Sequence, residues 1–127
     1  MAAPNIINVA TITGKTAYVT PANTNATILL ANAAASGKVF KVNLILAANL
    51  DGTNPYNATV AYNTVAAGSG TSYAIASTIS VPANATLVIA DKTASFYVEE
   101  DKSVVVTSSG ANKVTFFISY EELADAA

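Results

Sequence analysis

The sequence predicts an all-β protein: a single-domain antiparallel β-sandwich of jelly-roll-like form, with about 8–10 short strands and little or no helix. Apolar residues alternate with polar ones instead of recurring at helical spacing, which is typical of strands with one buried face. Glycine, proline and asparagine separate these segments every 8–12 residues or so, with no helical segment between them. The 127 residues suffice for one domain, 1–127, whose core needs no disulfide or metal.

Alternation is clearest near the C-terminus, where Val114, Phe116, Ile118 and Tyr120 share one face of a strand. The run 38–49 is longer, and its lysine and asparagine mark the face that meets solvent. The same pattern predicts strands near 6–12, 15–20, 26–31, 38–49, 57–65, 71–80, 86–90, 95–99, 102–108 and 113–121.

Turn-forming residues set the boundaries between these strands. Gly14 is predicted to divide the first two, and Pro-Ala-Asn at 21–23 and at 82–84 predicts turns in which proline fixes φ. Residues 121–127 are expected to be a C-terminal tail that frays or forms one helical turn. Hairpin connections are expected at 35–37, 68–70 and 109–112.

Composition argues against an enzyme. Cysteine and histidine are absent and every basic residue is lysine, so Ser-His-Asp relays, thiolate nucleophiles and the commonest metal ligands are excluded. A net charge of −2 with a pI near 4.8 argues against a nucleic-acid partner. No apolar run is long enough for a membrane helix, and the first residues do not resemble a signal peptide. We therefore predict a non-enzymatic protein with no cofactor, no small-molecule substrate and no membrane partner.

One acidic group could bind a hard cation: Asp91, Glu99, Glu100 and Asp101. Its spacing matches no calcium loop, and the lysines beside it in the sequence are expected to pair with the acids. We therefore predict a solvated turn and no metal site.

Sparse charge also predicts association. Only 11% of residues are charged, against about 25% in ordinary globular domains, so part of the surface is expected to be covered by other protein. Residues 1–12 are predicted to form an N-terminal arm or an edge strand at the subunit contact. The alternative is an ordinary first strand inside its own sandwich. The contact residues would be Ile6, Ile7, Val9 and Ile12.

The polar stretch 51–56 is predicted to project as an exposed loop, with Asn54, Pro55 and Tyr56 available for contact. Most other aromatic residues are expected to face the core. Tyr56 is therefore the one aromatic side chain expected to be free to stack on a sugar.

Several short segments resemble a known family. They are SGKVFKV (36–42) and ANLDGTN (48–54), then VPA (81–83), TLV (86–88) and FYVEEDKS (96–103), and finally SGANK (109–113) and SYEE (119–122). Over residues 15–123 the pattern resembles small virion structural proteins of tailed phages, particularly those that infect marine and freshwater cyanobacteria.

This resemblance implies a β-sandwich subunit of the virion, above all a head decoration or cement protein that bridges capsid subunits. Its partners would be the major capsid protein and itself, with a homotrimer favoured because symmetric sites on a capsid suit symmetric binders. It would be made in the host cytoplasm and assembled on the particle surface. Two alternatives stay open: a neck, tail or fibre subunit, and a carbohydrate- or receptor-binding β-sandwich.

Overall fold

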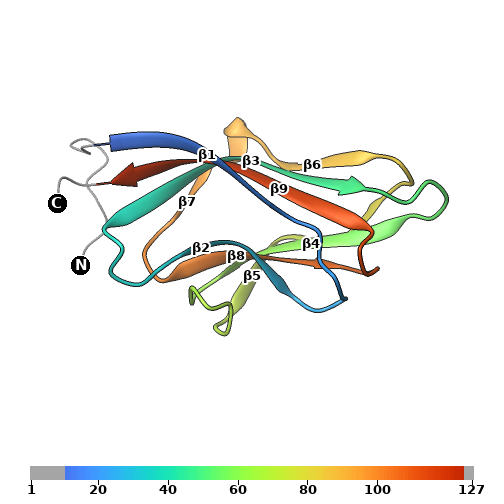
Figure 1. The fold of residues 1–127 in the computed structure, drawn as a ribbon, viewed down its shortest axis with the longest axis horizontal. Coiled ribbons are helices and arrows are strands. Elements are labelled where there is room, and N and C mark those ends of the chain that lie inside the picture. Colours follow the sequence, from blue (N-terminus) through green and yellow to red (C-terminus); the bar gives the residue numbers. More distant parts are fainter. Residues whose placement is uncertain (1–10, 125–127) are drawn as a thin grey trace.

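The computed structural model describes residues 11–124, which form two antiparallel sheets packed face to face (Figure 1). The first, called the β1 sheet, has the strand order β1-β9-β3-β6, with β7 also paired to β3. The second, called the β2 sheet, has the order β2-β8-β4-β5. The strands are β1 (Thr11–Val19), β2 (Thr27–Asn32), β3 (Lys38–Asn49), β4 (Tyr56–Asn63), β5 (Ser72–Val81), β6 (Thr86–Ala90), β7 (Phe96–Val98), β8 (Lys102–Ser108) and β9 (Val114–Ala124).

The strand order is that of a jelly roll. β6 pairs with residues 45–48 of β3 and β7 with residues 40–42, and a 3-10 turn, η1 (Lys92–Ala94), separates them. Counted as one interrupted strand, β6 and β7 bring the total to eight strands arranged as two interleaved Greek keys. The predicted all-β, jelly-roll-like sandwich is confirmed. Among residues 11–124, no helix is long and apolar enough to cross a membrane.

The core lies between the sheets and is built from the predicted alternation. In β9, Val114, Phe116 and Ile118 are fully buried, and Tyr120 on the same face is half-buried. Facing residues of the β2 sheet, such as Val104 and Val106, are also fully buried. Each such side chain contributes about 1.5–3 kcal/mol of transfer free energy, so this layer holds the two sheets together.

Gly14 was predicted to divide two strands, but β1 runs through it without interruption. Gly14 pairs with Glu121 in the ladder between β1 and β9, and a Cβ at this position would meet no atom within 4 Å. The glycine is therefore an ordinary ladder residue on an open surface. The part of the first predicted strand that precedes residue 11 lies outside the described residues.

The prediction of a tail from residue 121 is wrong for residues 121–124, which extend β9. Ala124 pairs with Thr11 of β1 on one side and with Lys38 of β3 on the other. Because strands flank β9 on both sides up to its last residue, its backbone groups are better satisfied in the sheet than in a helical turn. Residues 125–127 lie outside the described residues.

Phe116 and Phe117 provide a matched test of this core. Phe116 is fully buried, whereas its neighbour Phe117 is 37% exposed on the opposite face. We expect Phe116→Ala to lower the free energy of unfolding by about 3–5 kcal/mol through a cavity in the core, and Phe117→Ala to lower it by much less. Urea denaturation of both variants checks this. Equal losses would contradict the assignment of faces.

Candidate functional site

The edges of the two sheets carry almost no charge. β1 and β6 are the outer strands of the β1 sheet, and β2 and β5 are those of the β2 sheet. Lys15 is the one charged residue in these four strands. Natural proteins usually guard a free strand edge with lysine, proline or another interruption, because its open backbone groups pair readily with another chain. These edges are therefore candidates for contact with other subunits.

Lys15 itself is held by its own sheet. Its ammonium group pairs with one carboxylate oxygen of Glu122, and Lys38 pairs with the other oxygen at 2.5 Å. Hydrogen bonds from the two lysines hold the pKa of the Glu122 carboxyl below its ordinary value, and Glu122 in turn raises the pKa of Lys15. The two lysines thus join β1 and β3 to β9. Because the ammonium group of Lys15 is engaged by Glu122, it does not guard the edge of β1.

The four edges differ in regularity. β1 pairs with β9 over nine residues, from Thr11↔Ala124 to Val19↔Phe116, without a register shift. The pairings of β2, β5 and β6 with their neighbours all contain shifts in register. Because such bulges bend and twist a strand, they hinder pairing with a further strand. β1 is the most regular free edge in the described structure.

Large apolar side chains are exposed on these edges. Ile12 and Tyr18 of β1 are 62% and 68% exposed, and Tyr73 of β5 is 63% exposed. Ile12 belongs to the predicted contact segment and lies on an edge strand; Ile6, Ile7 and Val9 fall outside the described residues. Most aromatic residues are buried or pack against the core, as expected, and four are exposed. These are Tyr18, Tyr73, Tyr97 and Phe117.

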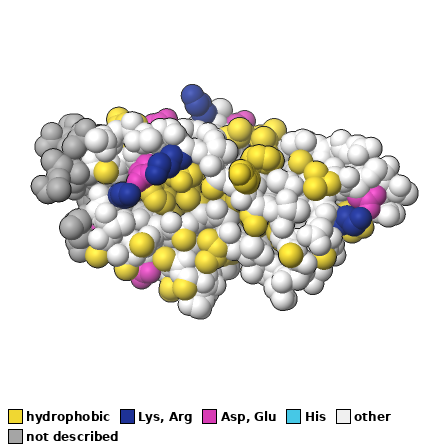
Figure 2. All heavy atoms as spheres, viewed as in Figure 1, with side chains coloured by type: hydrophobic (Ala, Val, Ile, Leu, Met, Phe, Trp, Pro, Cys, Tyr) yellow, Lys and Arg dark blue, Asp and Glu magenta, His cyan; other side chains and the backbone are white. Residues whose placement is uncertain are grey.

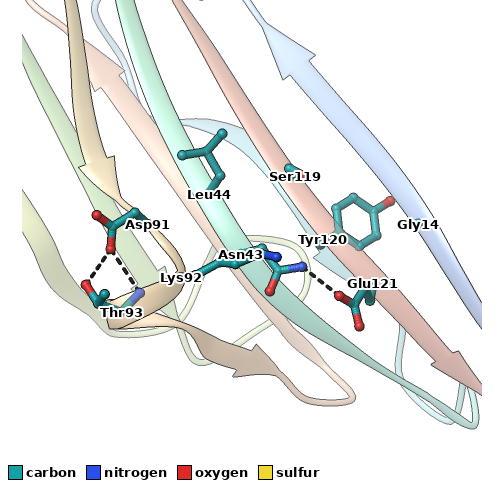
Figure 3. Close-up of a pocket in the computed structure, with 9 residues that line it drawn as sticks. All are labelled: Gly14, Asn43, Leu44, Asp91, Lys92, Thr93, Ser119, Tyr120 and Glu121. Atoms are coloured by element: carbon teal, nitrogen blue, oxygen red, sulfur yellow. Dashed lines mark hydrogen bonds between the residues drawn. The ribbon is translucent and has the colours of Figure 1, made fainter.

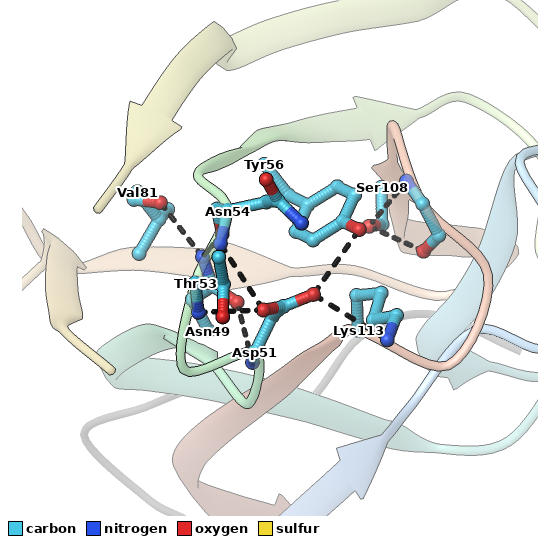
Figure 4. Close-up of polar contacts among 9 residues, drawn as sticks. Asn49, Asp51, Thr53, Asn54, Tyr56, Val81, Ser108 and Lys113 are labelled. Atoms are coloured by element: carbon cyan, nitrogen blue, oxygen red, sulfur yellow. Dashed lines mark hydrogen bonds and ion pairs between the residues drawn. The ribbon is translucent and has the colours of Figure 1, made fainter. Parts of the chain in front are cut away.

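At the end of the sandwich away from Glu122, Asp51 organises the 51–56 loop (Figure 4). Its carboxylate accepts hydrogen bonds from the backbone N–H of Thr53 at 2.7 Å and of Asn54 at 3.1 Å. It also pairs with the ammonium group of Lys113 at 3.4 Å. The two backbone donors are the main reason that the pKa of Asp51 falls from 3.8 to about 2.

Asn54 and Pro55 are exposed, as predicted, but Tyr56 is not a projecting loop residue. It is the first residue of β4, is half-buried and packs against the core. Its hydroxyl donates a hydrogen bond to Asp51 at 3.3 Å. The side chain closes the end of the sandwich, because β4 begins at Tyr56, one residue before the predicted strand 57–65. It offers no free aromatic face to a sugar.

Three of the four residues in the predicted acidic group, Asp91, Glu100 and Asp101, accept hydrogen bonds from the backbone. Asp91 accepts a hydrogen bond from the backbone N–H of Thr93 at 3.0 Å and caps η1. Glu100 accepts one from Gly37 at 2.9 Å, and Asp101 accepts one from a backbone N–H of the 64–71 loop. Within residues 11–124, no three acidic side chains gather as metal ligands would.

The neighbouring lysines do not pair with these acids, contrary to the prediction. Lys102 donates to the carbonyl oxygen of Thr64 at 3.4 Å. In the described part of the chain, the ion pairs join Lys15 and Lys38 to Glu122, and Lys113 to Asp51. Strands and loops distant in the sequence bring these partners together, so adjacency along the chain was a poor guide.

A shallow depression of about 620 Å³ lies on the outer face of the β1 sheet, beside η1 (Figure 3). Across its floor, the amide of Asn43 donates a hydrogen bond to the carboxylate of Glu121 at 2.9 Å. Asp91 and Thr93 bond to each other at its rim. Because two pairs of its polar groups bond to each other and the depression is widely open, it differs from the enclosed pockets that bind small ligands.

Three buried asparagines that were not predicted, Asn32, Asn49 and Asn63, end β2, β3 and β4 respectively. Each amide donates hydrogen bonds to backbone carbonyl groups of nearby segments, and each amide oxygen accepts a bond from the loop that follows its strand. The available signal was an asparagine directly after an apolar strand pattern. This signal becomes informative only when one asks which groups form hydrogen bonds with the buried backbone N–H and C=O groups of the following loop.

No protein-family model matches this sequence, and no curated protein matches it either. Among solved structures, the chain is similar to one described by the words "Bacillus endospore appendages form a novel family of disulfide-linked pili". The TM-score is 0.53 with 20% sequence identity, over 91% of this chain and 90% of that chain. At this identity the likeness shows a shared fold.

The loop carboxylate gives a pH-dependent prediction. Because the pKa of Asp51 is lowered in the folded protein, its contribution to stability is complete above pH 3.8 and is lost as the pH falls from there to about 2. We expect Asp51→Asn to be less stable than the wild type at neutral pH and to lose less stability over this acid range. Urea denaturation across this pH range measures both effects.

Tyr56→Phe is the control, because it removes one hydroxyl bond to Asp51 and leaves the carboxylate with its backbone donors. It should keep most of the acid dependence. If Asp51→Asn and the wild type lost the same stability over this range, Asp51 would not be the group responsible.

Proposed function

We propose that this protein is a non-enzymatic structural subunit that joins other copies of itself through the open edges of its sheets. The observation that carries this proposal is the near absence of charge from the four edge strands, whose single lysine is engaged by Glu122. A protein selected to remain a monomer guards such edges.

The energetics suit a repeated assembly. An edge contact adds a row of main-chain hydrogen bonds, each worth about 0.5–1.5 kcal/mol net. Alanine, serine and threonine, which are abundant on the edge strands, lose little side-chain entropy on burial. Contacts of this kind are weak singly, but many copies on one particle add their strength through avidity.

Within this class we propose a virion location, as a head decoration protein on the major capsid protein, with a homotrimer as the unit that binds. The resemblance of residues 15–123 to virion structural proteins of tailed phages supports this assignment. A neck, tail or fibre position in the same particle is the nearest alternative. Tyr56 packs against the core and therefore does not itself support the alternative of a sugar-binding role.

A second candidate is a subunit of a surface filament. The fold shared with the chain from the endospore appendage structure favours it. That structure is described as disulfide-linked, whereas the present chain contains no cysteine. A filament of this protein would therefore be held without disulfide bonds.

A capsid decoration protein and a filament subunit are expected to give different results in one assay. A decoration protein binds in a fixed, saturable number of copies to capsids prepared without it, and it forms only small closed oligomers alone. A filament subunit polymerises by itself at high concentration. Electron microscopy of the purified protein, with and without capsids, distinguishes the two.

If copies associate through strand edges, lysines added to those edges should reduce association. Thr13 of β1 and Ser77 of β5 are exposed edge residues. We expect the double variant Thr13→Lys, Ser77→Lys to form smaller species than the wild type in sedimentation velocity, because charge on a free edge opposes strand pairing. Its circular dichroism spectrum should be unchanged.

The matched control places both lysines in loops, as Ala22→Lys and Thr53→Lys. Both residues are exposed, and the change in net charge is the same. This control should keep the wild-type species. If the loop variant dissociated as readily as the edge variant, net charge rather than edge pairing would govern association.

A further inference from the structure

An uninterrupted row of apolar side chains crosses the outer face of the β1 sheet. Tyr18 of β1 lies opposite Phe117 of β9, Phe117 lies opposite Leu46 of β3, and Leu46 lies opposite Val88 of β6. We call these four residues the outer stripe. Tyr18, Phe117 and Val88 are 68%, 37% and 55% exposed, and Leu46 is half-buried.

The stripe is an organised surface. The rings of Tyr18 and Phe117 are tilted against each other with centroids 5.9 Å apart, a contact that holds both aromatic side chains in place. Figure 2 shows hydrophobic side chains gathered on the molecular surface over the middle of β1 and β9. Because the four members come from four different strands, the row exists only in the folded sheet.

Over β1, β9 and β3, the rows on both sides of the stripe are uncharged, whereas Asp91 and Lys92 lie beside Leu44 on the β6 side. The row before it contains Thr16, Ser119 and Leu44, and the row after it contains Thr115, Ala48 and Thr86. On β9 and β3, charges return one row further toward the termini. There Lys41 lies opposite Glu121 in the ladder.

Over β1, β9 and β3 this band is uncharged, so these three strands carry no charge that would repel the same band of a second copy. Two copies can approach face to face at the usual spacing of about 10 Å between packed sheets. The three rows cover roughly 20 Å by 20 Å, estimated from the strand spacing and rise. This area is small beside the roughly 800 Å² per partner of a standard interface, which indicates a reversible contact.

We propose that the outer stripe packs against the same stripe of a second copy of this chain, forming a face-to-face pair of β1 sheets. The contact is separate from the edge contact of the proposed function. Edge pairing extends a sheet sideways, whereas stripe packing joins two sheets back to back. Together the two contacts give a double layer, and each persists without the other.

The test isolates the stripe in the edge-blocked variant Thr13→Lys, Ser77→Lys. Both lysines lie away from the stripe, since Thr13 points to the other face of β1 and Ser77 belongs to β5 of the other sheet. Sedimentation velocity over a range of concentrations should show a monomer–dimer equilibrium. Adding Phe117→Thr should weaken dimerisation about tenfold or more, as loss of a central interface aromatic does.

Ile28→Thr is the matched control, because Ile28 is 40% exposed on the β2 sheet and lies outside the stripe. It should leave the dimer constant unchanged. Threonine keeps the strand propensity at both sites, and circular dichroism with thermal melting verifies the fold of each variant. A dimer that survives Phe117→Thr, or that Ile28→Thr weakens equally, overturns the proposal.

A unique cysteine gives a second readout, because the chain has none of its own. In the edge-blocked background, Val88→Cys should react with a maleimide more slowly as protein concentration rises. Constant reactivity up to the highest concentration, with protection appearing only on an assembled particle, would assign the stripe to a different protein. If edge lysines fail to reduce wild-type association while Phe117→Thr does, the edge proposal fails and the stripe proposal stands.

Discussion

The buried side-chain amides at the ends of three successive strands are the interaction on which the rest of the structure depends. Asn32, Asn49 and Asn63 are almost fully buried. The amide oxygens of Asn49 and Asn63 accept bonds from backbone N–H groups of the loops that follow, and Asn32 accepts one from the Ser36 hydroxyl and donates to the carbonyl oxygens of Lys38 and Val98. A buried peptide group without a partner costs about 1–3 kcal/mol. These amides supply such partners where β2, β3 and β4 leave the sandwich, so the chain reverses tightly at both ends of the fold.

The ion pairs also lie at the two ends of the sandwich. The two lysines on Glu122 lie at the end of the sandwich where β1 begins, and the pair Asp51–Lys113 closes the loops at the other end. Between these ends, the outer face of β1, β9 and β3 carries no charge from the row of Ser119 to the row of Thr115, and Asp91 and Lys92 lie at its β6 side. An edge strand and a neighbouring face can therefore both be apolar or neutral, which is the surface chemistry that multi-copy contacts need.

The jelly roll makes this arrangement possible because it is an open sandwich. A closed barrel has no edges, whereas two packed sheets keep four. In this chain, β2, β5 and β6 depart from regular register and β1 does not. The fold thus presents four weakly charged edges of unequal regularity, with β1 the most regular and the outer stripe beginning on that same strand.

The sequence by itself determined the fold class and much of the core. Alternation at Val114, Phe116 and Ile118 gave the correct strand and the correct buried face, because a strand has a period of two and one face must leave water. It could not show that Gly14 lies within a strand, that β9 continues to Ala124, or that Tyr56 closes the core. Those outcomes depend on which strand lies alongside. The outer stripe and the ion pairs of Glu122 were likewise decided only by tertiary structure, since cross-strand register joins residues about a hundred positions apart, and no local pattern encodes that register.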